Sequence, residues 1–189
     1  MTHPVDVWTV SLEILRPSIL SPDEQARAAR FIFDRDREKW ARARTILRTI
    51  LATYVQVGPA ELVFTYGEHG KPALRDFPGI GFNISHAGDY AMVAVTVDAQ
   101  VGIDLEFMRP NLNLADLLRR IGETNLPESR EDLYQVWTGR EARTKALGAP
   151  LMRVPHGDFR LVTLQAPEGY AASLVLVGFD PGISYRGAI

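Results

Sequence analysis

The sequence predicts an α+β fold in which helices pack against antiparallel sheets. Segments with strand-like alternation outnumber those that a regular succession of βαβ units would give. Consecutive strand segments are joined by turns of a few residues, which are too short for the crossover that parallel strands need. The hydrophobic share of 46% over 189 residues is ordinary for a globular protein and sufficient for a substantial core. We therefore expect one unit over residues 1–189.

The N-terminal part of the chain predicts a strand followed by helices. Residues 5–15 alternate between apolar and polar side chains, which is typical of a half-buried strand. Residues 21–24 (S-P-D-E) combine an N-cap serine, a first-turn proline and a capping-box glutamate, so a helix should begin there. Helical spacing of apolar residues resumes over 40–54, and Gly-Pro at 58–59 ends it.

The remaining chain predicts further strands and two more helices. Residues 81–86 and 90–97 are separated by an Ala-Gly-Asp turn and predict a hairpin. The spacing of leucines predicts a helix near 114–121, and a second helix over 137–148 ends at a glycine followed by Ala-Pro. The other expected strands are 62–66, 101–106, 159–163 and 170–177.

The composition excludes several classes of function. There is no cysteine, which removes disulfides, thiolate zinc sites and cysteine nucleophiles. The net charge of −2 does not suggest a general nucleic-acid binder. The sequence shows no apolar run of membrane-spanning length and no secretory signal at its start. We therefore expect a cytoplasmic monomer that engages neither nucleic acid nor membranes.

Two segments carry the acidic residues of the predicted site. The strand V-G-I-D-L-E places Asp104 and Glu106 on one face, and we expect both to face a solvent-filled cleft. The helix W-T-G-R-E-A-R-T-K-A-L-G places Glu141 and Lys145 one turn apart. If this helix packs beside the strand, the three carboxylates form an all-oxygen pocket suited to Mg²⁺, with the lysine near any phosphate that binds there.

In this order along the chain, the two motifs resemble the signature of 4′-phosphopantetheinyl transferases. The chain is more similar to the larger surfactin-synthetase-activating (Sfp) type than to the small trimeric holo-carrier-synthase type. The resemblance covers roughly residues 27–165 and implies two similar α/β lobes, for which halves 1–98 and 99–189 would fit.

The resemblance also implies an activity. Members move 4′-phosphopantetheine from coenzyme A to a serine of an acyl or peptidyl carrier protein, release 3′,5′-ADP and use Mg²⁺, with Mn²⁺ as an alternative. By this similarity, Asp104, Glu106 and Glu141 hold the metal. Glu141 takes the serine proton, directly or through a water, and Lys145 stabilises or protonates the leaving phosphate.

Further motifs resemble the family's contacts to coenzyme A. G-K-P at 70–72 and F-N-I-S-H at 82–86 match its nucleotide and pyrophosphate motifs, and basic residues of the first long helix match its 3′-phosphate contacts. Taken alone, G-K-P is a common turn, a histidine at a strand end is usually structural, and a basic helix is usually a solvated face. The predicted coenzyme A contacts are Arg37, Arg44, Lys71, Pro72, Asn83, Ser85, His86 and Lys145.

The segment after Glu106 is the predicted docking surface for a carrier protein. It is shorter than in typical family members, and it offers Leu117, Arg119 and Arg120 to an acidic partner helix. The other two leucines, Leu114 and Leu118, are four residues apart and should be core.

Two other interpretations remain at this level. The carboxylates and the lysine could form an ordinary surface ion network, or the chain could be a non-catalytic relative that binds coenzyme A or a carrier protein. Arg140 stands where many relatives have lysine, and we assign it no catalytic role. Fatty acid, polyketide and nonribosomal peptide pathways all stay open as sources of the carrier.

Overall fold

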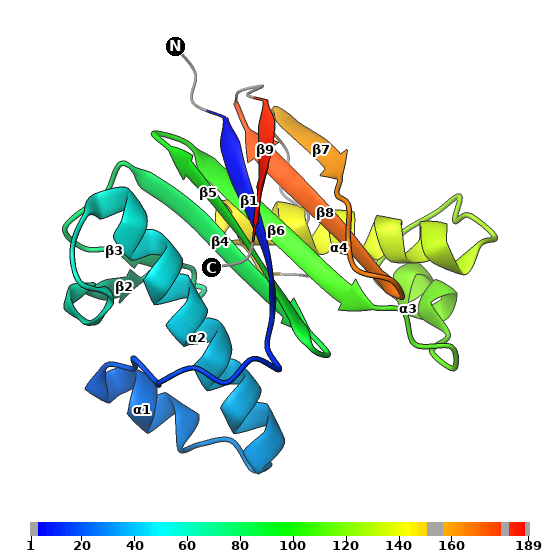
Figure 1. Cartoon of the computed structure of the whole chain (residues 1–189). Helices are drawn as coiled ribbons and strands as arrows, with labels where there is room; N and C mark the ends of the chain where they lie inside the picture. Colours follow the sequence, from blue (N-terminus) through cyan, green and yellow to red (C-terminus); the bar gives the residue numbers. More distant parts are fainter. Residues whose placement is uncertain (1–3, 151–156, 179–181, 188–189) are drawn as a thin grey trace.

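The computed structural model describes residues 4–150, 157–178 and 182–187. Two β-sheets pack face to face, and each carries one long helix on its outer surface (Figure 1). The predicted α+β class with antiparallel sheets and packed helices is confirmed.

The first sheet has the strand order β4-β5-β1-β9. Its strands are β1 (Val5–Ser11), β4 (Ile80–Ala87), β5 (Tyr90–Val97) and β9 (Ile183–Arg186). The β4–β5 and β5–β1 pairs are antiparallel, whereas β9 runs parallel to β1. Helix α2 (Asp34–Val55) covers the outer face of this sheet with Ile46, Leu47, Ile50 and Leu51, which pack on Val93 and Val95 of β5 and on neighbouring residues.

The second sheet has the order β6-β8-β7 and is entirely antiparallel. It consists of β6 (Gln100–Phe107), β7 (Phe159–Thr163) and β8 (Tyr170–Val177). Helix α4 (Arg130–Leu147) packs on its outer face through Ala142 and Ala146, and α3 (Leu114–Arg120) packs beside α4.

The space between the sheets is filled by apolar side chains from both. Met92 and Ala94 of β5 meet Ile103 and Leu105 of β6, while the alternate residues of β5 face α2. Strand β5 is therefore buried on both faces, which explains its almost uninterrupted apolar run.

Short elements complete the chain: α1 (Pro22–Ala28), the 3-10 turn η1 (Pro59–Glu61), and the two-stranded sheet of β2 (Phe64–Tyr66) with β3 (Pro72–Leu74). Glu24 accepts the backbone N–H of Ser21 at 3.0 Å, so the predicted start of α1 is confirmed. In the part of the chain that the structure describes, no helix is long and apolar enough to cross a membrane.

The structure differs from the sequence prediction in the bounds of some elements and in strands that were not predicted. The first strand ends at Ser11, and the last long helix begins at Arg130, where Ser129 accepts the Asp132 N–H as its N-cap. Strand β9 was not predicted, and it returns the C-terminal half of the chain to the first sheet. The proposed division into halves falls in the turn between β5 and β6 and stays a prediction.

Candidate active site

The site lies where strand β4 of the first sheet runs beside strand β6 of the second. Strand β6 lies at the edge of its sheet. On this edge its residues are hydrogen-bonded by side chains of β4 and not by the backbone of a neighbouring strand. The Asn83 amide oxygen accepts the Ile103 N–H at 2.9 Å, and the Ser85 hydroxyl donates to Asp104 Oδ1 at 3.0 Å. The F-N-I-S-H motif therefore joins the two sheets.

Helix α4 approaches the same strand closely at Gly102. A Cβ atom at this position would lie 2.0 Å from the Ala142 carbonyl oxygen and 2.4 Å from the Ala146 nitrogen. Only glycine permits backbone contact this close between a helix and a strand. The contact places the helix positions of Glu141 and Lys145 over the acidic half of β6.

Four charged side chains gather at this contact: Asp104, Glu106, Glu141 and Lys145. The Lys145 ammonium lies 2.5 Å from Asp104 Oδ1 and 3.0 Å from the Ser85 hydroxyl. Trp137, two turns before Lys145 on α4, donates its indole N–H to Glu106 at 3.3 Å. The predicted line of residues at a spacing of four along α4 thus faces the two carboxylates of β6.

Both glutamates of this acidic cluster have raised pKa values. Burial raises the pKa of Glu106 and of Glu141, and the nearby Asp104 carboxylate raises each further. Lys145 opposes the shift in both cases without cancelling it. The cluster therefore holds more negative charge than its own cation neutralises.

The expectation that Asp104 faces a solvent-filled cleft is wrong. Its side chain is buried, with 2% of the residue exposed, because α4 packs directly on β6 and Ser85 and Lys145 cover the carboxylate. Glu106 and Glu141 are only partly buried. The site is open at the glutamates and closed at the aspartate.

The donor set of the cluster fits a hard divalent cation. Asp104 Oδ2 is buried and has no hydrogen-bond partner, and the three side chains offer only carboxylate oxygens. As the side chains stand in the described residues, no three acidic or histidine groups converge into a ready-made metal site. Asp104 is instead paired with Lys145. A cation that bound here would take the free oxygen of Asp104 and relieve the repulsion among the carboxylates.

A cavity of about 510 Å³ opens beside the cluster. Glu106 and His86 line it together with three basic residues that the sequence analysis did not single out, namely Arg35, Lys39 and Arg109. The His86 side chain is accessible from this cavity, but crowding by protein atoms and the charges of Lys145 and Lys39 lower its pKa. Asp36 also lines the cavity, and Lys39 is paired with Asp89, so the side chains there that can receive an anion are chiefly His86, Arg35 and Arg109.

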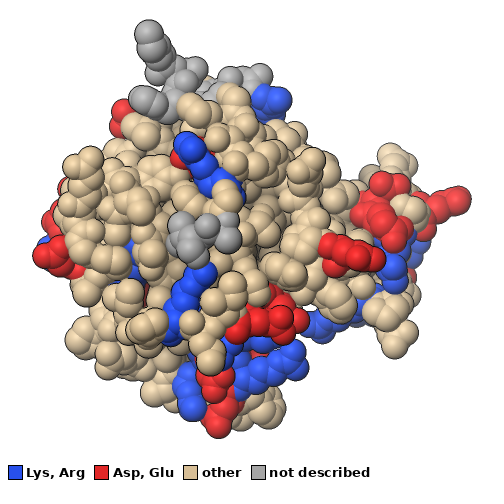
Figure 2. All heavy atoms as spheres, viewed as in Figure 1, with Lys and Arg blue, Asp and Glu red and all other residues tan. Residues whose placement is uncertain are grey.

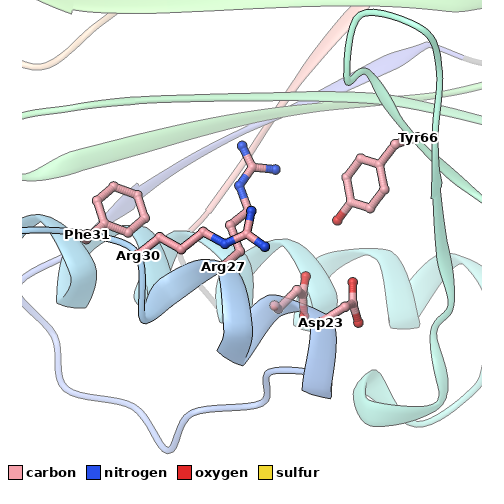
Figure 3. Close-up of a pocket in the computed structure, with 6 residues that line it drawn as sticks. Asp23, Arg27, Arg30, Phe31 and Tyr66 are labelled. Atoms are coloured by element: carbon pink, nitrogen blue, oxygen red, sulfur yellow. The ribbon is translucent and has the colours of Figure 1, made fainter.

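A second cavity of about 680 Å³ lies between α1 and strand β2. Arg27 of α1 and Arg30, two residues after the end of this helix, line it, and the Tyr66 hydroxyl points toward it from the opposite side (Figure 3). Beneath it, Arg44 pairs with Glu24 at 2.5 Å and stacks over the Phe64 ring at 4.5 Å.

Comparison with known proteins identifies the family. The family model described as "4′-phosphopantetheinyl transferase, N-terminal" matches residues 8–98. The 4′-phosphopantetheinyl transferase HetI of Nostoc sp. is 35% identical over 179 residues, covering 85% of this chain and 76% of HetI. The chain belongs to the 4′-phosphopantetheinyl transferase family. The transferase Sfp of Bacillus subtilis is 26% identical over 185 residues, covering 87% and 80% of the two chains.

This membership confirms the predicted family, its Sfp-like type and the enzyme class. The individual residue assignments stay predictions, and the structure shows where each one lies. Ser85 and Lys145 join Asp104, and His86 is next to them in the cavity beside the cluster. Asn83 belongs to the same contact between β4 and β6 through its bond to Ile103, whereas the remaining predicted coenzyme A contacts, Arg37, Arg44, Lys71 and Pro72, do not touch the acidic cluster.

The two arginines predicted for the 3′-phosphate have different surroundings. Arg44 is 7% exposed and already paired with Glu24, although its guanidinium reaches to 3.4 Å from the Tyr66 hydroxyl at the second cavity. Arg37 is half-exposed and pairs with Asp34 at 3.0 Å on the surface of α2. Lys71 donates to backbone carbonyls, and Pro72 begins β3.

The predicted docking segment forms α3, which projects at one edge of the molecule among clustered charges (Figure 2). Leu117 and Arg120 are exposed, and Arg119 pairs with Asp116 at 2.8 Å. The expectation that Leu114 and Leu118 belong to the core is confirmed. Behind α3, Arg140 forms an ion pair with Glu123, so its charge is used to tie α4 to the preceding segment.

Proposed function

We propose that the protein transfers the 4′-phosphopantetheine group of coenzyme A to a serine hydroxyl of an acyl or peptidyl carrier protein and releases 3′,5′-ADP. The observation that carries this proposal is the acidic cluster itself. It has an unpartnered buried oxygen on Asp104, two glutamates with raised pKa values and a lysine within hydrogen-bond distance. An ordinary surface ion network would be neutralised and solvated instead.

Asp104, Glu106 and Glu141 are the residues that would hold Mg²⁺. When bound, the ion supplies positive charge that neutralises the pyrophosphate and the charge developing on it. The family's name supports the transfer, whereas the dependence on Mg²⁺ is inferred from the chemistry of the donor set.

The proton and the leaving group are assigned to residues of α4. Glu141 accepts the proton of the carrier serine, directly or through a water, from its position one turn before Lys145 on α4. The serine oxygen forms a bond to the phosphorus that bears the pantetheine arm. The bond from that phosphorus to the bridging oxygen breaks, and Lys145 stabilises or protonates the phosphate that leaves as part of 3′,5′-ADP.

Coenzyme A is assigned to the two cavities. Ser85 and His86 donate to the pyrophosphate beside Lys145. The 3′-phosphate is assigned to the cavity that Arg27 and Arg30 line, where the predicted Arg44 pairs with the lining residue Glu24. The predicted Arg37 pairs with Asp34 on the surface of α2 and is retained as a predicted contact. Pro72 and Asn83 are retained as predicted neighbours of the nucleotide.

The carrier protein is assigned to α3 and the mouth of the cavity beside the cluster. Leu117, Arg119 and Arg120 offer one apolar and two basic groups, which suit an acidic helix on the carrier. The pathway that supplies the carrier, the cytoplasmic location and the monomeric state stay predictions.

Mass spectrometry of a purified carrier protein tests the proposal. Incubation with the enzyme, coenzyme A and Mg²⁺ should add about 340 Da, the mass of phosphopantetheine. A carrier whose acceptor serine is replaced by alanine, and a reaction that contains EDTA, should both show no gain. A panel of carriers from fatty acid, polyketide and nonribosomal peptide systems should include a substrate. Coenzyme A binding without transfer to any of them would favour a non-catalytic relative.

A further inference from the structure

The last turn of α4 has a carbonyl that the sequence leaves without a helical partner. The Ala146 oxygen would normally accept the N–H of residue 150, but Pro150 has no N–H. The neighbouring carbonyls are served locally, because Ala149 donates to Thr144 and the C-cap Gly148 donates to Lys145. An outside donor is therefore needed one residue after Lys145.

The edge of β6 has a second carbonyl in the same situation. Backbone groups two residues apart on a strand point to the same side, so the Val101 and Ile103 groups both face the first sheet. Asn83 serves Ile103 through its side chain. No strand of the described residues pairs with this edge to serve Val101.

One side chain serves both carbonyls. The Lys71 ammonium donates to the Ala146 oxygen and, at 3.3 Å, to the Val101 oxygen. Its stem packs on Gly148, whose missing Cβ would lie 3.4 Å from the lysine Cβ. Burial lowers the pKa of Lys71 to about 8, and no charged neighbour contributes to the shift. The ammonium is thus committed to the backbone of two elements.

We propose that Lys71 is a positioning residue that holds the C-terminal turn of α4 against the edge of β6. The Ala146 carbonyl follows Lys145 directly, and Val101 precedes Asp104 by three residues on the same strand. The lysine therefore fixes the distance between the two elements whose side chains make the acidic cluster. This role rests on the proposed transferase activity of that cluster and differs from a contact to coenzyme A.

The kinetic test compares three variants at a temperature at which all are folded. Lys71→Met keeps the stem and removes the donors, so kcat should fall by about tenfold to a hundredfold while KM for coenzyme A changes by less than about twofold. Lys71→Arg restores donors and should recover most of kcat. Arg75→Gln is the matched control, because Arg75 is exposed, pairs with the adjacent Asp76 and belongs to the same segment.

Amide hydrogen exchange provides a second test that does not depend on enzymatic activity. In the ligand-free protein, Lys71→Met should increase amide exchange in the last turn of α4 and at the start of β6, and Arg75→Gln should not. If Lys71→Met does not fold, Lys71→Gln keeps one amide donor and should show an intermediate increase. If the wild-type protein transfers no phosphopantetheine, the proposed function is refuted. Amide hydrogen exchange in the ligand-free variants would still decide whether Lys71 positions α4 against β6.

Three results would overturn the positioning role. Unchanged amide exchange in a folded Lys71→Met protein would show that the bonds from Lys71 to Val101 and Ala146 do not hold α4 against β6. A large rise in KM for coenzyme A with kcat preserved would make Lys71 a ligand contact. A lowered melting temperature with unchanged kcat would leave it a purely structural residue.

Discussion

Two buried ion clusters of this protein differ in their balance of charge and in their hydrogen bonding. Between α1 and α2, the Glu24 carboxylate lies between two guanidiniums: Arg44 donates to one oxygen at 2.6 Å and Arg48 to the other at 2.7 Å. In the acidic cluster, three carboxylates share the single ammonium of Lys145. One cluster has excess cation and complete hydrogen bonding, and the other has excess anion and an unpartnered oxygen.

The pKa values follow this difference. Burial by itself would raise the pKa of Glu24, but the charge of Arg44 and hydrogen bonds from Ser21, Arg48 and Arg44 outweigh it, so the pKa is lowered. Burial also acts on Glu106 and Glu141, and there the neighbouring Asp104 adds to it. The contrast indicates that the first cluster is part of the folded framework and that the second is completed by a ligand.

The largest expected effect comes from removing the carboxylate of the cluster formed by Glu24, Arg44 and Arg48. Glu24→Gln leaves two buried guanidiniums without a counter-charge and should lower the free energy of unfolding by about 3–5 kcal/mol. Urea denaturation measures this change. Glu38→Gln, which breaks the exposed pair with Arg42, is the matched control and should cost only about 0–1 kcal/mol. Similar losses of unfolding free energy in both variants would mean that the Glu24 cluster does not stabilise the fold more than a surface ion pair does.

The next effect concerns Asp104 in metal-free protein. Asp104→Asn removes the buried pairing with Lys145 and also the charge that repels Glu106 and Glu141, but keeps an oxygen for the Ser85 hydroxyl. The loss of the buried pair should outweigh the relieved repulsion, so unfolding should become easier by about 1–2 kcal/mol. The variant should also lose transfer activity, because the buried oxygen is the strongest candidate metal ligand. Denaturation in EDTA measures the first effect, and the carrier mass assay measures the second. A more stable Asp104→Asn protein would contradict the role of Lys145 as its partner.

Local patterns in the sequence predicted much of this structure. Alternation located the β4–β5 hairpin, and the spacing of four along α4 correctly aligned Trp137 and Lys145 with the acids of β6. The G-I-D-L-E motif also contains Gly102, whose role in bringing α4 to the strand needs three-dimensional packing to be recognised. Periodicity predicts which residues of a helix or strand lie on its buried face, but it does not predict which other element packs on that face.

Long-range pairing accounts for what the sequence did not predict. Strand β9 joins β1 across almost the whole chain, and no local signal specifies that partner. Glu24 was expected as a capping residue, and the structure shows that it also neutralises Arg44 and Arg48 from a distant helix. The buried state of Asp104 has the same origin, since α4 covers it from another part of the chain.

Within the Glu24 cluster, Arg44 and Arg48 should behave differently toward the nucleotide, because Arg44 reaches the Tyr66 hydroxyl at the second cavity. Arg44→Ala should reduce the preference for coenzyme A over dephospho-coenzyme A by roughly tenfold, because a charge-assisted contact to the 3′-phosphate contributes about 1.5–3 kcal/mol. Arg48→Ala is the control, since Arg48 is 1% exposed and bonds Glu24 and backbone oxygens without reaching the cavity. Calorimetric titration with both ligands gives the preference. An equal loss of preference in both variants would assign the effect to the framework instead.

The smallest effect should have the opposite sign to the others. Glu106→Gln keeps the oxygen that accepts the Trp137 N–H and removes one repelling charge, so metal-free protein near neutral pH should gain about 0.5–1 kcal/mol. The folded-state pKa of Glu106 lies above its ordinary value, so the folded protein binds this proton more tightly than the unfolded chain does. Its stabilising contribution is therefore complete below the ordinary glutamate pKa and is lost as the pH rises through the raised pKa.

The gain from Glu106→Gln should accordingly vanish in acid and grow as the pH rises through that window. Added Mg²⁺ at neutral pH should reverse the order, because it stabilises the wild type by binding the folded state and binds the variant less well. Thermal unfolding over a pH series, with EDTA and with Mg²⁺, measures both trends. A gain that is independent of pH would show that Glu106 is not under repulsion, and the contrast between the two clusters would then be lost.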